Sequence, residues 1–349
     1  MVNYTIDSMS KAGYEVCISF DDLGRKKDVF FTNKHGSKEG PVFWYYPNGY
    51  LKAVCTFRKN RLNGLYQVFD YEGNVLIRYT YLEGVQHGKY EHFFQDGKRA
   101  IEGNFNKGLK EGEFKEYHYG LGTVRATWSA VKGKREGKGI WYYPNNQIHF
   151  TCNFRNDLLE GEYLTYDTLG RLISKQFYKN DVLEGNLIKY YPDGQIAAVC
   201  KYKAGKLNGI YKRYYSNGNI LSEVSYSKGK KDGIMKRYYP SGEIEMVCEY
   251  DNDLLKGQIK IYEIDGKLKE GIHKYFYPNG SIHVLGYCLN GRPEGILEDY
   301  DENGIILSRL KCKNGMLHDI SQYFNSQGKP YRIEFYENGD FVKLEEIGN

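Results

Sequence analysis

The stretch FWYYPNGYLKAVCTF, at residues 43–57, joins a run of aromatic residues to a Pro-Asn-Gly sequence and then to an alternating segment. Pro47 fixes the φ angle that a type I turn needs, and Gly49 suits the left-handed position that closes a bulged hairpin. In residues 51–57 the apolar side chains recur at every second position, as in a strand that is covered on one face. The stretch therefore predicts a β-hairpin.

Closely similar stretches recur along the chain, for example YYPDGQIAAVCKY at 190–202 and YYPSGEIEMVCEY at 238–250. When the units are aligned on the glycine that opens each of them, the step is 24 residues, with one extra residue in 112–136 and a short unit at 257–270. The sixth position is aromatic in every unit: Tyr45, Phe69, Phe93, Tyr117, Tyr142, Tyr166, Tyr190, Tyr214, Tyr238, Tyr262, Phe276, Tyr300 and Phe324. A fixed period of this length indicates a repeat architecture.

The predicted fold is all-β: an elongated array of about 13 stacked antiparallel hairpins, forming a single curved or twisted sheet or a solenoid. Three regions are expected. Residues 1–39 would form a degenerate N-terminal capping unit, 40–256 the regular hairpins, and 257–349 further repeats and a C-terminal cap after the shortened unit. Before each turn, positions 3 and 6 are both apolar although they should face opposite ways, which leaves open either burial on both faces or a bulge.

The pattern G-x-x-x-x-Y-Y-P-N-G-x-I/L, followed by a distal aromatic residue, resembles the MORN repeat. It is most similar to the bacterial variant form found in antitoxin-like proteins of the YwqK type. The resemblance covers about residues 40–348. It implies a non-enzymatic scaffold that binds a protein, with an antitoxin, immunity or host-interaction role in a bacterium. The scrambled turn at 118–123 and the short unit at 257–270 depart from the pattern.

The sequence offers no grouping typical of an enzyme or a metal centre. The eight histidines lack metal-ligand spacing, and the seven cysteines include no CxxC pair. Four cysteines share position 16 of their units and two share position 18, which favours packing as small apolar residues over a single reactive thiol. We expect no cofactor, no small-molecule substrate and, without a signal or spanning segment, a cytoplasmic location.

Charge gives the candidate binding residues. Lys189, Arg213 and Arg237 occupy position 5 of successive units, and Lys212, Lys236, Lys260 and Lys274 occupy position 4. Equal positions of stacked units align, so these residues predict cationic rows in 189–274. The rows either bind an anionic partner, namely an acidic protein, a membrane lipid or a nucleic acid, or serve solubility and protect the sheet edge. Trp44 and Trp141, both at position 5, could anchor a partner or pack on a neighbouring unit.

Overall fold

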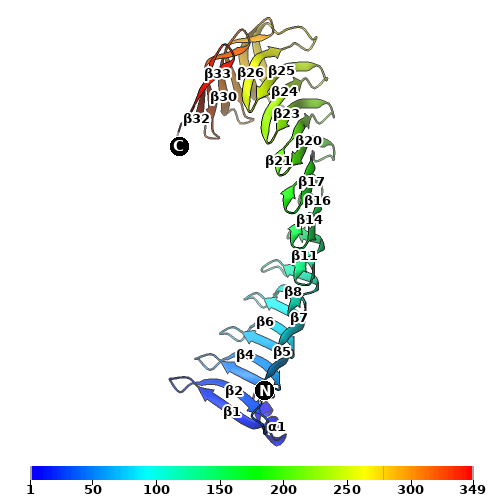
Figure 1. The fold of residues 1–349 in the computed structure, drawn as a ribbon, viewed down its shortest axis with the longest axis vertical. Helices are drawn as coiled ribbons and strands as arrows, with labels where there is room; N and C mark the ends of the chain where they lie inside the picture. Colours follow the sequence, from blue (N-terminus) through cyan, green and yellow to red (C-terminus); the bar gives the residue numbers. More distant parts are fainter. Residues whose placement is uncertain (1, 278, 348–349) are drawn as a thin grey trace. The chain divides into compact units, whose positions relative to one another are not determined.

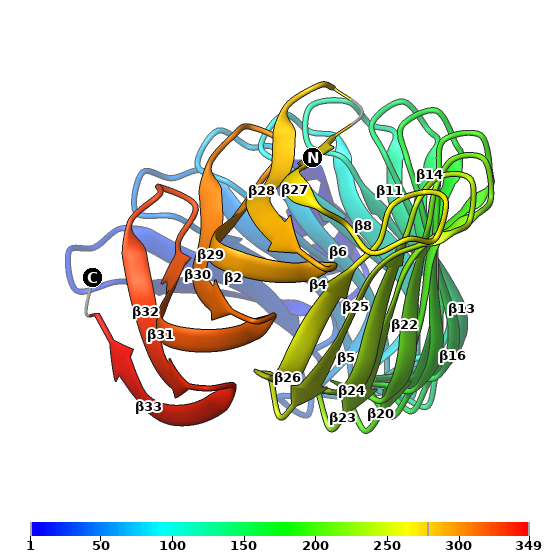
Figure 2. The same cartoon turned by 90° about the horizontal axis from the view of Figure 1, so that it is seen from above.

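The computed structural model describes residues 2–277 and 279–347, which contain one helix and 33 strands in a single antiparallel sheet with hairpin order (Figures 1 and 2). The chain divides into two compact units, residues 1–171 with 178–181, and residues 172–177 with 182–349. The all-β repeat array predicted from the sequence is confirmed.

The first unit contains the helix and the strands up to residue 166. They are α1(Val2–Lys11), β1(Glu15–Phe20), β2(Lys26–Thr32), β3(Gly40–Tyr45), β4(Leu51–Arg58), β5(Arg61–Phe69), β6(Val75–Leu82), β7(Val85–Phe93), β8(Arg99–Asn106), β9(Leu109–Lys110), β10(Gly112–Tyr117), β11(Val124–Val131), β12(Lys134–Arg135), β13(Gly137–Tyr142), β14(Ile148–Arg155), β15(Leu158–Leu159) and β16(Gly161–Tyr166).

The second unit contains the remaining strands, except that residues 178 and 179 at the end of β17 belong to the first unit. They are β17(Leu172–Lys179), β18(Val182–Leu183), β19(Gly185–Tyr190), β20(Ile196–Lys203), β21(Lys206–Leu207), β22(Gly209–Tyr214), β23(Ile220–Ser227), β24(Lys230–Tyr238), β25(Ile244–Asp251), β26(Leu254–Ile261), β27(Gly271–Phe276), β28(Ile282–Leu289), β29(Arg292–Tyr300), β30(Ile306–Lys313), β31(Met316–Phe324), β32(Pro330–Glu337) and β33(Asp340–Glu346).

A β-bulge between positions 5 and 6 resolves the question that the sequence leaves open. In β3 the pairing with β4 shifts between Trp44 and Tyr45, and in β24 the pairing with β25 shifts between Arg237 and Tyr238. The extra residue lies on the strand after the turn, as Lys52 in β4 and Glu245 in β25, and it distorts the pairing beside the aromatic residue at position 6. The position 6 side chains are mostly half-buried.

The second tyrosine of the YYP sequence joins neighbouring hairpins. Its hydroxyl donates to the main-chain carbonyl of the position 6 residue in the next unit, as in Tyr191 to Tyr214 at 2.6 Å and Tyr239 to Tyr262 at 2.8 Å. The same bond recurs at Tyr46, Tyr143, Tyr215 and Tyr277. The sequence pattern predicts a role for position 6 only, and this role of position 7 was not predicted.

The acidic residue before the opening glycine also has a turn role. Glu184 accepts a hydrogen bond at 2.7 Å from the main-chain N–H of Ala204, which lies in the turn to the next unit with a φ of 50°. Glu39, Glu111, Glu136, Glu160, Glu270 and Glu294 accept an equivalent bond. These contacts stabilise a left-handed backbone that costs energy for any residue with a Cβ atom.

In the second unit the hairpin order changes after the short unit at 257–270. There β26 pairs with β25 on one side, while β27 pairs with β28. The N–H groups of Ile259 and Ile261 donate instead to the carbonyls of Gly315 and Gly291, both at 2.6 Å. A Cβ atom at Gly291 would lie 2.7 Å from the Ile261 carbonyl oxygen, so this close approach requires glycine.

This change lets β27–β33 fold back onto β22–β26 within the second unit, as Figure 2 shows for β26 and β29–β33. The shared core is formed by Cys248, Leu255, Ile259, Ile261, Val284, Cys288, Leu297, Cys312, Leu317 and Tyr336. The short unit thus produces a two-layered sandwich in which hairpins far apart in the sequence face one another.

Candidate functional site

The strand register of the second unit aligns the position 5 residues in two rows. In β19–β26 the register runs Lys189, Ala198, Arg213, Ser222, Arg237, Met246 and Ile261. In β27–β32 it runs Tyr275, Val284, Asp299, Ser308, Tyr323 and Arg332. Because the two layers pack face to face, the two rows meet.

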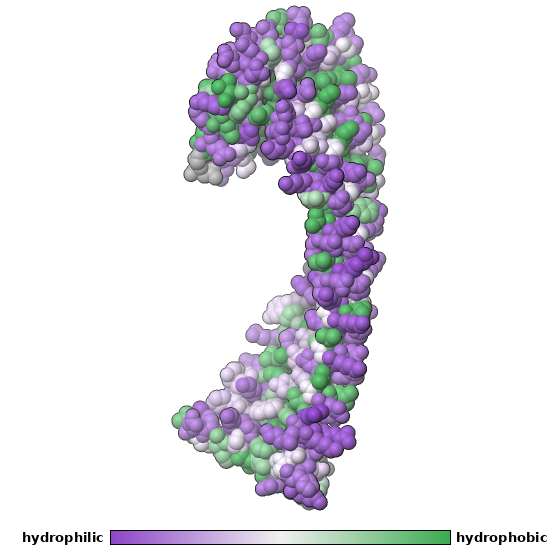
Figure 3. Space-filling view, viewed as in Figure 1, coloured by the Kyte–Doolittle hydropathy of each residue, from purple (hydrophilic) through white to green (hydrophobic). Residues whose placement is uncertain are grey.

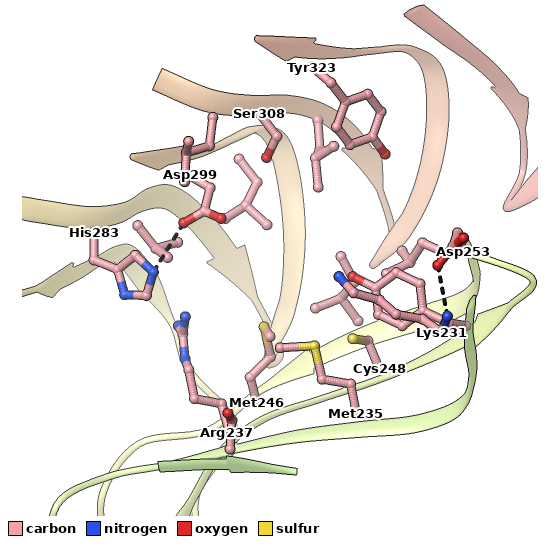
Figure 4. Close-up of a pocket in the computed structure, with 18 of the residues that line it drawn as sticks. Lys231, Met235, Arg237, Met246, Cys248, Asp253, His283, Asp299, Ser308 and Tyr323 are labelled. Carbon is pink, nitrogen blue, oxygen red and sulfur yellow. Dashed lines mark hydrogen bonds and ion pairs between the residues drawn. The ribbon is translucent and has the colours of Figure 1, made fainter. Parts of the chain in front are cut away.

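A cavity of about 400 Å³ lies between the two rows (Figure 4). Arg213, Arg237 and Met246 line it from one layer, and Asp299 and Tyr323 from the other. Figure 4 shows His283 and Asp299 on one side, Lys231 and Asp253 on the other, and Met235, Met246 and Cys248 between them. The cavity is the candidate functional site because it combines an apolar wall with converging polar groups.

A buried ion pair forms part of the wall on the Arg237 side. Arg237 and Glu245 have side-chain exposures of 8% and 0%, and the guanidinium donates from Nε at 2.8 Å and Nη2 at 3.0 Å to the two carboxylate oxygens. Burial raises the pKa of Glu245, opposed by the Arg237 charge. Glu245, at position 13, is the extra residue of the bulge, because the pairing runs from Arg237 with Met246 to Tyr238 with Ile244, and this places it beside position 5.

Two histidines and an aspartate surround this pair. His283 Nε2 lies 3.3 Å from Asp299 Oδ1, and the buried His273 Nε2 lies 3.9 Å from Glu245 Oε1. Burial, with Arg237 nearby, lowers the pKa of both histidines to about 4. Burial raises the pKa of Asp299 to about 6, against the effect of Arg237. At neutral pH the histidines are therefore uncharged and Asp299 is ionised.

A second polar cluster lies along the other row. Glu334, 1% exposed, accepts hydrogen bonds from the hydroxyls of Tyr323 at 2.8 Å and Tyr336 at 2.9 Å, and it is ion-paired with Arg332. Burial, followed by the Glu334 charge, raises the pKa of both tyrosines, so both hydroxyls remain donors at neutral pH. Glu245, Asp299 and Glu334 were not predicted from the sequence. The available signal was the unusual chemistry at positions 13, 5 and 16 of their units.

The predicted cationic residues divide between the two faces of the sheet. The register aligns Lys212, Glu223, Lys236, Val247 and Lys260 in one row, on the face opposite the cavity. Lys212 donates to Glu223 at 2.7 Å, so this carboxylate partly neutralises the row. Lys274 lies on β27, which pairs with β28 and not with β26, and is therefore separate from that row.

The position 5 cations differ in exposure. Lys189 and Arg213 are exposed, whereas Arg237 is buried and paired, so Arg237 does not contribute to an exposed cationic surface. Trp44 and Trp141, in the first unit, are half-buried. Trp44 lies 6.1 Å from Tyr66 between ring centroids, and Trp141 stacks on Phe150 at 4.7 Å. Both indoles therefore pack on neighbouring aromatic residues.

The pKa values of the buried thiols agree with a packing role. Burial raises the pKa of Cys55 and Cys248 to about 12 and that of Cys152 to about 11, so these thiols are poor nucleophiles at neutral pH. Within residues 2–277 and 279–347, no cluster of three or more His, Cys, Asp or Glu side chains could hold a metal ion. The same residues include no helix long and apolar enough to cross a lipid bilayer.

Comparison with known proteins identifies the repeat. The family model described as "MORN repeat variant" matches residues 38–59, 86–107, 135–156, 159–180, 183–204, 207–228, 231–252 and 269–287. None of the curated proteins compared with this chain matches it.

Among solved structures, the chain is similar to one in "Crystal Structure of TcdB2-TccC3-Cdc42", with 11% identity over 97% of this chain and a TM-score of 0.15. It is also similar to one in "Crystal Structure of TcdB2-TccC3 without hypervariable C-terminal region", with 12% identity over 95% of this chain and a TM-score of 0.15. The chain covers 22% and 17% of the lengths of those chains.

Proposed function

Because this chain is a MORN-repeat protein, we propose that it is a non-catalytic scaffold whose sheet surface binds a partner protein. MORN repeats are interaction modules of a non-catalytic type. A repeat array presents equivalent side chains at regular intervals, which suits recognition of an extended partner. The cysteines are free thiols, which supports a reducing compartment, and we place the protein in the cytoplasm on that basis.

The observation that carries the proposal is the face of β22–β26 that points away from the cavity. Ile210 and Ile234, at position 2, are both 52% exposed and lie on the same face as Lys212, Lys236 and Lys260. Large aliphatic side chains exposed beside lysines suit a partner that offers apolar and acidic side chains together. Figure 3 shows hydrophobic and hydrophilic residues interleaved on its visible face.

The same face argues against attachment to a lipid membrane or a nucleic acid through charge alone. Glu223 lies between Lys212 and Lys236 in the row and is bonded to Lys212. Arg237 is buried against Glu245. The two predicted cationic rows therefore have a lower positive charge density than their lysines and arginines would suggest, and binding to polyanions depends on that density.

Affinity capture with the full chain tests the proposal. The chain is immobilised, proteins from its native host are captured, and cross-linking with mass spectrometry locates the contacts. We expect a stoichiometric protein partner that is lost when Lys212, Lys236 and Lys260 are changed to Glu, and retained in Lys313→Glu, an exposed lysine near the turn after β30. Capture of no stoichiometric partner would contradict the proposal.

Vesicles of anionic lipid and oligonucleotides provide the comparison. If either binds, with an affinity that falls steeply between low and moderate salt, and the same three lysine changes abolish this binding, attachment to a polyanion is the function instead.

An antitoxin or immunity role in a bacterium is a narrower form of the proposal. It requires the captured partner to be toxic when expressed alone and harmless when expressed with this chain.

A further inference from the structure

The cavity between the two position 5 rows contains polar atoms that lack a protein partner. His283 Nδ1 and Arg332 Nε are each shielded from solvent and make no hydrogen bond among the described residues, and Asp299 Oδ1 has only its 3.3 Å contact with His283 Nε2. All three residues line the cavity. A buried polar atom without a partner costs free energy, so two around one space indicate that something else completes them.

The charges around the cavity nearly balance. Arg237 is neutralised by Glu245, and Arg332 by Glu334. The remaining lining cations, Arg213 and Lys231, are matched in number by Asp299 and Asp253, and the pKa of His283, lowered to about 4, leaves it neutral. A ligand with a net charge would therefore find no uncompensated charge of opposite sign there.

The unpartnered atoms instead require a donor and an acceptor. With the neutral His283 ring donating from Nε2 towards Asp299, His283 Nδ1 accepts a hydrogen bond, and the Arg332 Nε–H donates one. Between these polar groups the wall is apolar and includes Met235, Met246 and Leu310. A peptide amide supplies one N–H and one C=O, and an apolar side chain can cover the methionines, whose flexible thioethers adapt to different shapes.

We propose that this cavity binds an uncharged peptide segment of the partner protein and takes up one of its apolar side chains. The proposal rests on the protein-binding function proposed above. A cavity of about 400 Å³ is within the range of small-ligand sites, so it has room for a residue and its flanking amides. The cavity thus acts as the anchoring point, while the outer face of β22–β26 supplies additional contacts.

Methionine methyl NMR on the full chain tests the site without the partner. The chain has five methionines, of which Met235 and Met246 line the cavity while Met9 and Met316 do not. With the methyl groups labelled with ¹³C and assigned by Met→Leu variants, N-acetyl-leucine N-methylamide is titrated as the probe. We expect saturable shifts at Met235 and Met246, with a Kd on the order of 1 mM for a probe of this size.

A cavity-filling variant and its matched control check the location. Ser308 lines the cavity on β30, and Ser308→Phe should weaken probe binding at least tenfold. Lys313→Phe places the same side chain at the exposed end of that strand and should leave binding unchanged. If Ser308→Phe fails to fold, the methyl shifts of the unsubstituted chain still decide the question.

Charged probes check the ligand class. Hexanoate and hexylamine should shift the two methyl groups at least tenfold less than the capped amide at equal concentration. Equal or larger shifts with either would overturn the assignment to an uncharged amide. Shifts at all methionines alike, or at none, would overturn the site. A failed capture experiment with intact probe binding would reject the scaffold proposal alone, since the two measurements are independent.

Discussion

The Arg237–Glu245 pair gives the sharpest test of the folded-back second unit. Glu245→Gln removes the counter-charge but keeps the shape, leaving a guanidinium of 8% exposure without an anion. Breaking a pair at such depth costs about 3–5 kcal/mol, because the surviving charge loses its partner and does not regain water. The double substitution Arg237→Met with Glu245→Leu removes both charges and should cost no more than about 1–2 kcal/mol.

Hydrogen exchange read by mass spectrometry can resolve this loss locally. Peptides from β24, β25 and β28–β30 should exchange roughly 10²- to 10³-fold faster in Glu245→Gln, since each 1.4 kcal/mol corresponds to a factor of ten. Trp44, Trp128 and Trp141 all belong to the first unit, so tryptophan fluorescence during urea unfolding serves as the internal control. That transition should not move.

Two results would refute the reasoning. If Glu245→Gln leaves exchange in β24 and β25 unchanged, the guanidinium is not buried by the facing layer. If the double substitution is as damaging as Glu245→Gln, the loss comes from packing and not from an uncompensated charge. Accelerated exchange throughout both units would show that the effect is not confined to the sandwich.

Three further measurements follow from the repeat and the cavity. Tyr191→Phe removes the 2.6 Å bond to the Tyr214 carbonyl and should cost about 1 kcal/mol in urea unfolding, while the neighbouring Tyr190→Phe should cost little. Ala204→Asn should stabilise the chain by about 0.5–1 kcal/mol, because Ala204 has a φ of 50° and Asn tolerates that conformation; a lower midpoint would contradict this. Between pH 6.5 and 4 the unfolded chain takes up protons at His273 and His283 while the folded chain does not, because folding lowers the pKa of both to about 4, so the folded state loses stability as the pH falls. Asp299 has the opposite effect: its pKa is raised to about 6 in the folded state, so its protonation stabilises the folded state over the same range. Asp299→Asn should therefore steepen the loss of stability between pH 6.5 and 4, as monitored by hydrogen exchange of β28–β30, and an unchanged profile would contradict the assignment.

The regular part of the fold could be predicted from the sequence because its signals are local. The Pro-Asn-Gly turn, the period of 24 residues and the alternation after each turn act within one hairpin, and each appears in the structure as predicted. The bulge beside Tyr45 could not be predicted, because a pattern of apolar residues does not distinguish an extra residue from burial on both faces.

The site could be predicted only in part, since it depends on contacts between distant hairpins. Register placed Arg213 and Arg237 in one row, as repeat alignment implies. Periodicity could not show that another layer covers that row, and so Arg237 was assigned to an exposed surface. The short unit at 257–270 marked a departure from the pattern, but nothing local to it shows that β26 meets the turns of later hairpins.

The bonds from Ile259 and Ile261 to Gly315 and Gly291 have a consequence for the order of folding. Hairpins of the first unit pair with strands close in sequence, so each can form as soon as its neighbour leaves the ribosome. The second edge of β26 does not pair with a strand close in sequence. It pairs with glycines that are synthesised about thirty to sixty residues later. Until then its N–H groups are unpaired and can bind an unrelated strand. A pause or truncation after residue 261 should therefore yield a nascent chain that chaperones bind at β26.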